Sequence, residues 1–181
     1  MAERPNSRPT ATSRSDKPPQ SSDVRRANPK MDFPQVPMDE HRQEVVECVR
    51  NNQNAVIIGE TGSGKTTRIP DFLLESFPEA NIAITQPRRV AARSVARYVA
   101  SRRGEKIGGE VGYQVRFEDE TTEGTRANFM TDGILLRKLQ FDPLLEEYDI
   151  VMVDEAHERS LNIDFVLGLL KRAKPNEKSR A

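Results

Sequence analysis

A glycine-rich segment between two apolar stretches is the feature that most restricts how this chain can fold. Residues 59–66 read GETGSGKT and match the pattern G-x-x-x-x-G-K-[ST]. Glycines let the backbone curl so that its N–H groups converge, and a following helix adds the positive end of its dipole. The β-branched run 55–58 before it is typical of a buried parallel strand, and residues 66–76 have helical spacing. The segment is therefore predicted to bind phosphate groups, in preference to forming an ordinary glycine turn.

A second apolar run, residues 150–153, ends in two acids, Asp154 and Glu155. In enzymes with such a phosphate loop, an acid at this strand end holds Mg²⁺, and a neighbouring acid can deprotonate the attacking water. We therefore interpret Asp154 as a metal residue and Glu155 as the catalytic base. The alternative is a surface pair at a helix start, where acids are common. We interpret His157 as a coupling residue near the γ-phosphate and His41 as a surface side chain.

Short apolar runs alternate with helical patterns from residue 38 onward. The predicted strands are 55–58, 82–85, 111–117, 128–131 and 150–153, and the predicted helices are 39–50, 66–76, 90–103, 132–139 and 161–172. Alternation of this kind is typical of an α/β fold in which a parallel sheet carries helices on both faces.

The N-terminal residues differ in composition from the rest of the chain. Residues 1–30 hold five prolines, seven basic and three acidic residues, so a formal net charge of zero combines a +4 arm with a −4 remainder. Few apolar side chains are available there to offset the entropy of ordering. We expect a disordered basic Pro/Ser-rich tail over 1–37, a domain over 38–172 and a polar tail over 173–181. The arm is interpreted as a solvated linker, with an RNA-attracting arm or nuclear signal as the alternative.

Cysteine usage and hydropathy indicate the compartment. Cys48 is the only cysteine, so no internal disulfide can form and a reducing, intracellular environment is expected. No apolar run approaches the ~20 residues of a membrane span, and the N-terminus lacks the apolar stretch of a signal peptide. No membrane association is expected.

Residues 154–160, DEAHERS, resemble the signature of the DEAH-box RNA helicases of superfamily 2. The likeness covers residues 38–172, and its segments occur in the family's order. They are GETGSGKTT at 59–67 (motif I), TQPRRVAA at 85–92 (motif Ia), VGYQVRFE at 111–118 and FMTDGILLR at 129–137 (motif Ib).

This resemblance implies a RecA-like ATP-dependent RNA helicase in which ATP hydrolysis drives stepwise movement along single-stranded RNA. ATP and Mg²⁺ are the implied cofactors. The implied nucleotide-binding residues are Gly59, Glu60, Thr61, Gly62, Ser63, Gly64, Lys65, Thr66 and Thr67. Lys65, Glu155 and His157 are the implied catalytic residues, and Thr66, Asp154 and Glu155 the implied metal residues.

The same resemblance places Arg88, Arg89, Thr131 and Asp132 against the RNA backbone. The alternative for the two arginines is a solvated pair at a helix start. Cations at that end oppose the helix dipole, so an anionic partner explains them better. Polar groups at the start of the predicted helix 132–139 are also suited to a phosphate.

Two departures from the family pattern affect these expectations. Tyr98 stands where family members usually carry the arginine that stacks on adenine, so either Tyr98 or Arg97 is expected to take that role. Members also continue after the position of Lys171 into a strand carrying Ser-Ala-Thr and a second RecA-like domain, whereas residues 172–181 are polar. In the fold of the family that this chain resembles, that strand lies between the phosphate-loop strand and the strand corresponding to the one that ends at Asp154. We therefore expect an incomplete sheet, in which each buried unpaired backbone group costs roughly 1–3 kcal/mol.

Two functional hypotheses remain for the chain. The first is the ATP-binding part of an RNA helicase, and the second is a catalytically silent fragment that binds nucleotide or RNA weakly. A phosphate-loop kinase or GTPase would leave residues 85–92 and 154–157 unexplained. Family habit and the basic tail slightly favour the nucleus over the cytoplasm.

Overall fold

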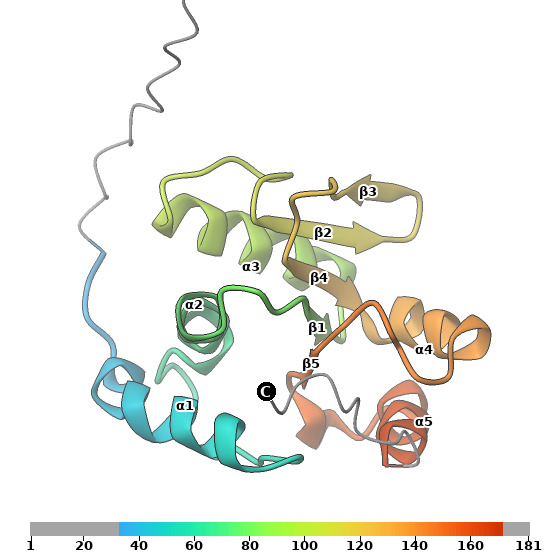
Figure 1. Cartoon of the computed structure of the whole chain (residues 1–181), viewed down its shortest axis with the longest axis horizontal. Helices are drawn as coiled ribbons and strands as arrows, with labels where there is room; N and C mark the ends of the chain where they lie inside the picture. The colour runs from blue at the N-terminus through green and yellow to red at the C-terminus, as the bar shows by residue number, and fades with distance from the viewer. Residues whose placement is uncertain (1–32, 172–181) are drawn as a thin grey trace, which may run out of the picture.

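The computed structural model describes residues 33–171, which form one sheet flanked by helices (Figure 1). The strands are β1 (Ile82–Gln86), β2 (Val111–Val115), β3 (Glu118–Glu120), β4 (Ala127–Thr131) and β5 (Ile150–Val153). The helices are η1 (Pro37–His41), α1 (Arg42–Asn51), α2 (Lys65–Ser76), α3 (Arg89–Arg102), α4 (Asp132–Phe141), η2 (Ala156–Glu158) and α5 (Leu161–Leu170). The spatial order of the strands is β3-β2-β4-β1-β5.

The sheet is parallel except at one edge. β1 lies between β4 and β5 and pairs in parallel with both, and β2 pairs in parallel with β4. The predicted strand 111–117 is two residues too long, because β2 ends at Val115, the chain turns at Phe117, where φ is 71°, and β3 returns antiparallel to β2. β3 consists of three acidic residues, so no apolar pattern marked it in the sequence.

Successive residues of the central strands point to opposite faces of the sheet, as strand geometry requires. In β1, Ile82 and Ile84 pack with helices α1 to α3, whereas Ala83 packs with α4 and α5. In β4, Phe129 packs on the same face as Ile82 and Ile84, and Met130 packs on the same face as Ala83. Two apolar cores result, one on each side, which confirms the predicted α/β class with helices on both faces.

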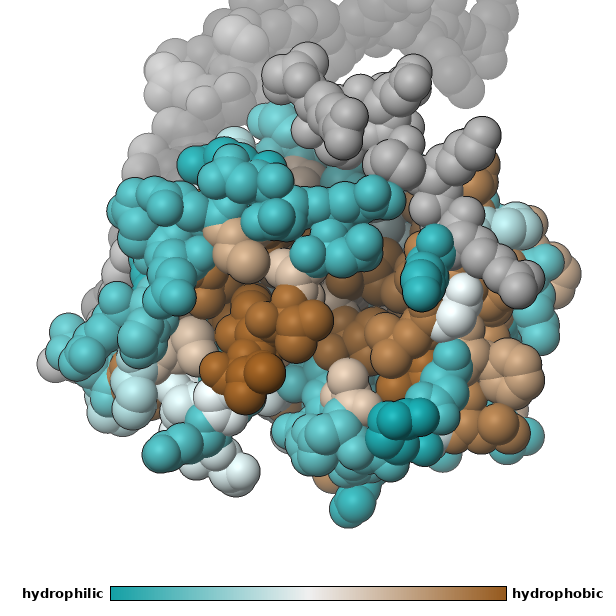
Figure 2. Space-filling view, turned by 90° about the horizontal axis from the view of Figure 1, so that it is seen from below, coloured by the Kyte–Doolittle hydropathy of each residue, from teal (hydrophilic) through white to brown (hydrophobic). Residues whose placement is uncertain are grey.

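The predicted strand 55–58 is wrong. Those residues form neither helix nor strand, and Val56 and Ile58 are 83% and 90% exposed. A strand exists only through its neighbours, and none of the strands within residues 33–171 pairs with this segment or with the free edge of β5. The sheet is therefore incomplete on the side of β5, as expected. Figure 2, which shows the molecule from below, has apolar surface on this side.

The predicted tail boundary needs one correction. Residues 1–32 and 172–181, where both tails were predicted, lie outside the described residues. Residues 33–37 were assigned to the disordered tail, but the Phe33 ring packs edge-on against Tyr98 at 5.5 Å and Pro37 begins η1. Aromatic packing and helix initiation therefore bring these five residues into the domain. Within the described part, no helix is long and apolar enough to cross a membrane.

Candidate nucleotide-binding site

The glycine-rich loop lies directly before α2 and is closed by backbone torsions that glycine favours. Gly62 and Gly64 have φ of 82° and 95°, and Gly64 is the N-cap of α2. A Cβ on Gly64 would lie 2.5 Å from Cγ2 of Val36, so no larger residue fits without a shift. The Met38 N–H donates to the Ser63 carbonyl at 3.0 Å. The loop is therefore fixed on one side by the segment that leads into η1.

Lys65, at the first position of α2, folds back onto the loop. Its ammonium donates to the carbonyls of Gly59 and Glu60 at 2.6 and 2.7 Å and lies 3.4 Å from the Ser63 hydroxyl. These acceptors hold the charge beside the curled backbone at a helix N-terminus, where anions bind favourably. Binding of a phosphate would replace carbonyl acceptors with phosphate oxygens around the same ammonium.

A buried ion cluster anchors α2 behind the loop. Arg68 pairs with Asp39 of η1 and with Asp71, and Asp71 also accepts from Arg102 of α3 at 3.1 Å. Burial raises the pKa of Asp71 despite these arginines. Burial acts on Asp39 too, but the Val36 N–H and Arg68 outweigh it and lower the pKa of Asp39. The cluster joins the loop's helix to both of its neighbours.

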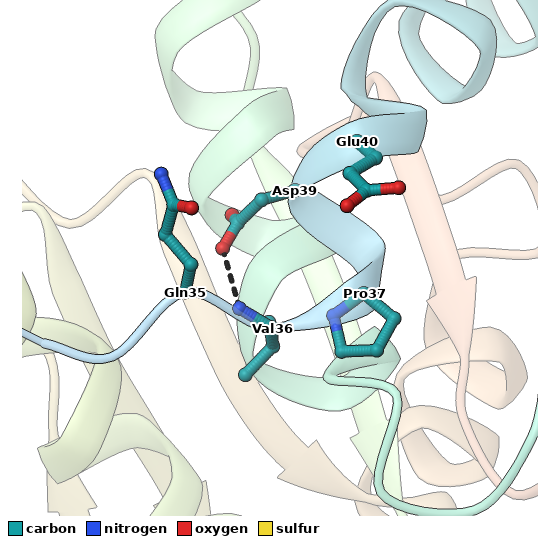
Figure 3. A pocket seen from close by; sticks show the side chains of 5 residues that line it. All are labelled: Gln35, Val36, Pro37, Asp39 and Glu40. Carbon is teal, nitrogen blue, oxygen red and sulfur yellow. Dashed lines mark hydrogen bonds between the residues drawn. The ribbon is translucent and has the colours of Figure 1, made fainter.

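A pocket lies where the N-terminal segment enters η1. It is lined by Gln35, Val36, Pro37, Asp39 and Glu40, and the Asp39 carboxylate points to the Val36 N–H at 2.9 Å (Figure 3). None of the residues that the sequence assigned to binding or catalysis lines it. The pocket adjoins the phosphate loop through Val36 but adds no predicted site residue.

At the acidic strand end, hydrogen bonds hold both oxygens of the Asp154 carboxylate. Asp154 is 7% exposed, and its Oδ2 accepts from Nε2 of Gln86 at 2.7 Å while its Oδ1 accepts from the Glu155 N–H at 2.9 Å. Glu155 has a φ of 51°, in the left-handed region that costs a non-glycine residue energy and that is frequent at functional sites. His157 Nε2 lies 3.3 Å from Glu155 Oε2. The structure thus brings together the predicted metal residue, base and coupling residue.

The donor chemistry at this site fits Mg²⁺. Asp154 and Glu155 supply carboxylates here, and Thr66, in the phosphate loop's helix α2, offers a hydroxyl; these are the hard oxygen ligands that Mg²⁺ prefers. Among residues 33–171, no group of three or more His, Cys, Asp and Glu side chains could hold a metal by itself. Mg²⁺ is usually bound through one or two carboxylates together with phosphates and waters, so a site without a full protein cage agrees with this ion.

In the part of the chain that the structure describes, polar contacts do not join the two predicted halves of the site. Within residues 33–171, no hydrogen bond or ion pair links Lys65 or Thr66 to Asp154, Glu155 or His157. The phosphate loop and the strand end remain separate parts in this structure.

The predicted RNA residues lie at the same end of the sheet as Asp154. The Arg88 side chain is 78% exposed and lies 3.8 Å from Glu158, which follows the DEAH segment. The Arg89 side chain is half exposed and lies 4.0 Å from Glu118. Both pairs are long and solvated, so both guanidinium groups remain available to an anionic ligand.

Thr131 and Asp132 differ in exposure at the start of α4. Thr131 is the N-cap residue, half buried and without a side-chain cap hydrogen bond. Asp132 is 4% exposed, and its Oδ1 has no hydrogen-bond partner among residues 33–171. Burial raises the pKa of Asp132, the Glu158 carboxylate adds to the rise, and the Thr85 hydroxyl opposes it. A phosphate contact at this helix start would therefore come from backbone N–H groups and Thr131, not from the Asp132 carboxylate.

The two candidates for the adenine contact point in different directions. Arg97 lies over the Tyr113 ring at 5.9 Å and 3.5 Å from the Tyr113 hydroxyl. Tyr98 is 38% exposed and packs against Phe33, and Arg102 lies over the Phe33 ring at 4.9 Å.

Gln86 is the contact that sequence reasoning missed. It is 2% exposed at the end of β1, and it faces Asp154 only because β1 and β5 pair in register. The signal in the sequence was a polar residue that ends an apolar strand, but its partner lies 68 residues away.

Comparison with known proteins agrees with this geometry. The model of the family "DEAD/DEAH box helicase" matches residues 39–178. The chain is 46% identical over 152 residues to the ATP-dependent RNA helicase HrpA of Escherichia coli K12, covering 82% of this chain and 12% of that protein. It is 46% identical over 138 residues to HrpA of Borreliella burgdorferi, covering 75% of this chain and 17% of the relative.

A yeast relative extends the likeness to eukaryotes. The chain is 47% identical over 140 residues to the probable ATP-dependent RNA helicase DHR2 of Saccharomyces cerevisiae, covering 75% of this chain and 19% of that protein. The chain thus spans less than a fifth of the length of each of these three relatives. With the loop at the start of α2 and the buried acid at the end of β5, these matches show that the chain belongs to the DEAD/DEAH box helicase family.

Proposed function

We propose that this chain is the ATP-binding part of an ATP-dependent RNA helicase and that it couples ATP hydrolysis to movement along RNA. The observation that carries the proposal is the Asp154 carboxylate, which is buried and held on both oxygens at the carboxyl end of a parallel strand. Ligands of open α/β sheets bind at this end of the strands. The names of the similar proteins, ATP-dependent RNA helicases, support the same activity.

The residues divide the proposed chemistry between them. Lys65 and the backbone of residues 59–64 bind the terminal phosphates of ATP, since the ammonium already lies among the loop's acceptors. Thr66 and Asp154 would hold Mg²⁺, which would offset the negative charge that develops on the phosphates. Glu155 orients and deprotonates the attacking water. His157, 3.3 Å from Glu155, holds that carboxylate in place.

RNA is the proposed partner, contacted through its phosphate backbone. Arg88 and Arg89 supply positive charge beside the Asp154 strand end, and the start of α4 supplies backbone N–H groups and the Thr131 hydroxyl. Contacts of this kind position a nucleic acid without reading its sequence.

Tyr98 is the better candidate for the adenine contact. Its ring is partly exposed and packs against Phe33 beside Arg102, and a ring held this way can stack on a base. Arg97 is engaged with Tyr113 instead.

The second candidate function is nucleotide or RNA binding without turnover. The observation that favours it is the exposed segment 55–58 before the phosphate loop, which pairs with none of the strands within residues 33–171. A loop held on one side only is less pre-organised for a transition state.

RNA-stimulated ATP hydrolysis separates the two candidates. We expect the 181-residue chain to hydrolyse ATP faster with single-stranded RNA than without it, and we expect Lys65→Ala to abolish that turnover. Lys65-dependent nucleotide binding without turnover above the Lys65→Ala control would support the second candidate. The absence of turnover, of nucleotide binding and of RNA binding would contradict both candidates.

A further inference from the structure

Gln86 makes a buried hydrogen bond to the predicted metal carboxylate. Its Nε2 donates to Asp154 Oδ2 at 2.7 Å, with the two residues 2% and 7% exposed. The β1–β5 register places them opposite each other, since Thr85 pairs with Val153 and the Asp154 N–H donates to the Thr85 carbonyl at 3.3 Å. The contact therefore follows from the sheet and not from a mobile loop.

The chemistry of the pair suits a metal carboxylate. A buried charge is costly unless it is hydrogen-bonded, and an apolar residue at position 86 would leave Asp154 Oδ2 without this donor. An arginine or lysine would neutralise the charge, whereas an amide fixes the carboxylate and leaves it negative. The Glu155 N–H holds the other oxygen, so rotation of the carboxylate is restricted at both atoms. Each oxygen keeps a lone pair for a further ligand.

We propose that Gln86 is a positioning residue that fixes the orientation of the Asp154 carboxylate for the Mg²⁺ of the bound nucleotide. This inference rests on the proposed function. Partners that orient metal ligands in this way typically change metal affinity about 10–100-fold when they are removed.

The experiment measures binding of the fluorescent nucleotide mant-ADP to the full 181-residue chain, with MgCl₂ and with EDTA. Gln86→Met has similar length and no donor. We expect it to reduce the Mg²⁺-dependent gain in mant-ADP affinity by about tenfold and to leave the affinity in EDTA within about twofold of wild type. Gln86→Asn keeps the amide but is one methylene shorter, and the same loss is expected. It therefore serves as the second variant where Gln86→Met does not fold.

Tyr148→Phe is the matched control. It removes the half-buried hydrogen bond from Asn128 Nδ2 to the Tyr148 hydroxyl at 3.0 Å, on the face of the sheet that carries α4 and α5. Thermal unfolding is measured for each variant, and the Mg²⁺ dependence of the control should equal that of wild type. An unchanged Mg²⁺ dependence in the folded Gln86 variants, with only a lower melting temperature, would overturn the proposal.

A double-mutant cycle tests whether Gln86 acts through Asp154. Gln86→Met should have no additional effect on the Mg²⁺-dependent gain in an Asp154→Asn background, because the oriented group is gone. Additive losses would contradict the proposed route. Failure of the proposed function itself has a different signature: wild type would bind mant-ADP no better than Lys65→Ala, with or without Mg²⁺.

Discussion

The two halves of the candidate site differ in how the fold holds them. Asp154 ends a strand that pairs with β1, and both of its oxygens accept hydrogen bonds. The phosphate loop is held by α2 and by the Val36–Met38 segment, but the residues before it are unpaired, with Ile58 90% exposed. The same sequence pattern thus forms a paired strand in one half and a segment without secondary structure in the other.

The difference shows that a strand depends on its neighbours more than on its own residues. Residues 150–153 and 55–58 are both short apolar runs, and both satisfy the pattern of a buried parallel strand. The first lies beside β1 and makes a ladder, whereas the second has no adjacent strand within residues 33–171. The acid end is therefore pre-organised for a ligand, and the loop is pre-organised only from α2 onward.

Backbone hydrogen exchange should show the largest contrast. Amides of β1 are expected to exchange roughly 10³-fold or more slowly than those of residues 55–58, since β1 opens only with much of the sheet. Exchange resolved by residue in the 181-residue chain measures this, with the amides of α2 as an internal reference for the loop's helical side. Equal protection of the two segments would contradict the comparison.

Asp71 is expected to have the next largest effect, because it supports the better-held side of the loop. Asp71→Ala removes both carboxylate oxygens and leaves the largely buried guanidinium groups of Arg68 and Arg102 without this acceptor, so it should lower the free energy of unfolding by about 3 kcal/mol although burial raises the pKa of Asp71. Glu147→Gln, which breaks an exposed pair with Lys138, should cost less than about 1 kcal/mol. Urea denaturation measures both, and equal costs would show that the cluster adds nothing beyond a surface pair.

Alanine variants of the two loop glycines should distinguish the cost of backbone torsional strain from the cost of a steric clash with Val36. Both have positive φ, but a Cβ on Gly62 meets nothing within 4 Å, whereas one on Gly64 meets Val36. Gly62→Ala should raise the free energy of the loop's bound conformation only by the torsional cost of a positive φ, about 1–2 kcal/mol, and should weaken mant-ADP binding by no more than that. Gly64→Ala should weaken mant-ADP binding about tenfold further, an added cost near 1.4 kcal/mol. Equal affinities for the two variants would mean that Val36 moves freely and does not fix the loop.

Asp132 should give the smallest effect, with a defined pH dependence. Because the folded pKa of Asp132 is raised, the folded state holds its proton more tightly than the unfolded state, and stability falls as pH rises from about 3.8 through the folded pKa. Asp132→Asn should therefore raise the free energy of unfolding by about 0.5–1 kcal/mol at pH 7, and this increase should become smaller at acidic pH. Thermal melts of both proteins across pH measure this, and a gain that grows as pH falls would contradict the assignment.

Most helices and strands, and the residues that make up the phosphate loop, could be predicted from the sequence. Helix α2 and strands β1, β4 and β5 follow from apolar periodicity, and Gly62, Gly64 and Lys65 lie in the loop that the motif predicts. What could not be predicted depends on partners distant in sequence. The Gln86–Asp154 contact needs the β1–β5 register, and the exposure of Val56 needs the absence of a neighbouring strand.

The central claim is that the loop binds phosphate and the strand end supplies the Mg²⁺ ligand of one nucleotide site. Binding of mant-ATP to wild type, Lys65→Ala and Asp154→Asn, each with MgCl₂ and with EDTA, tests it most directly. We expect Lys65→Ala to weaken mant-ATP binding in both conditions, whereas Asp154→Asn should weaken it only when Mg²⁺ is present. An effect of Asp154→Asn that is equally large in EDTA, or no effect of either change, would show that the loop and the strand end do not form one Mg²⁺-nucleotide site.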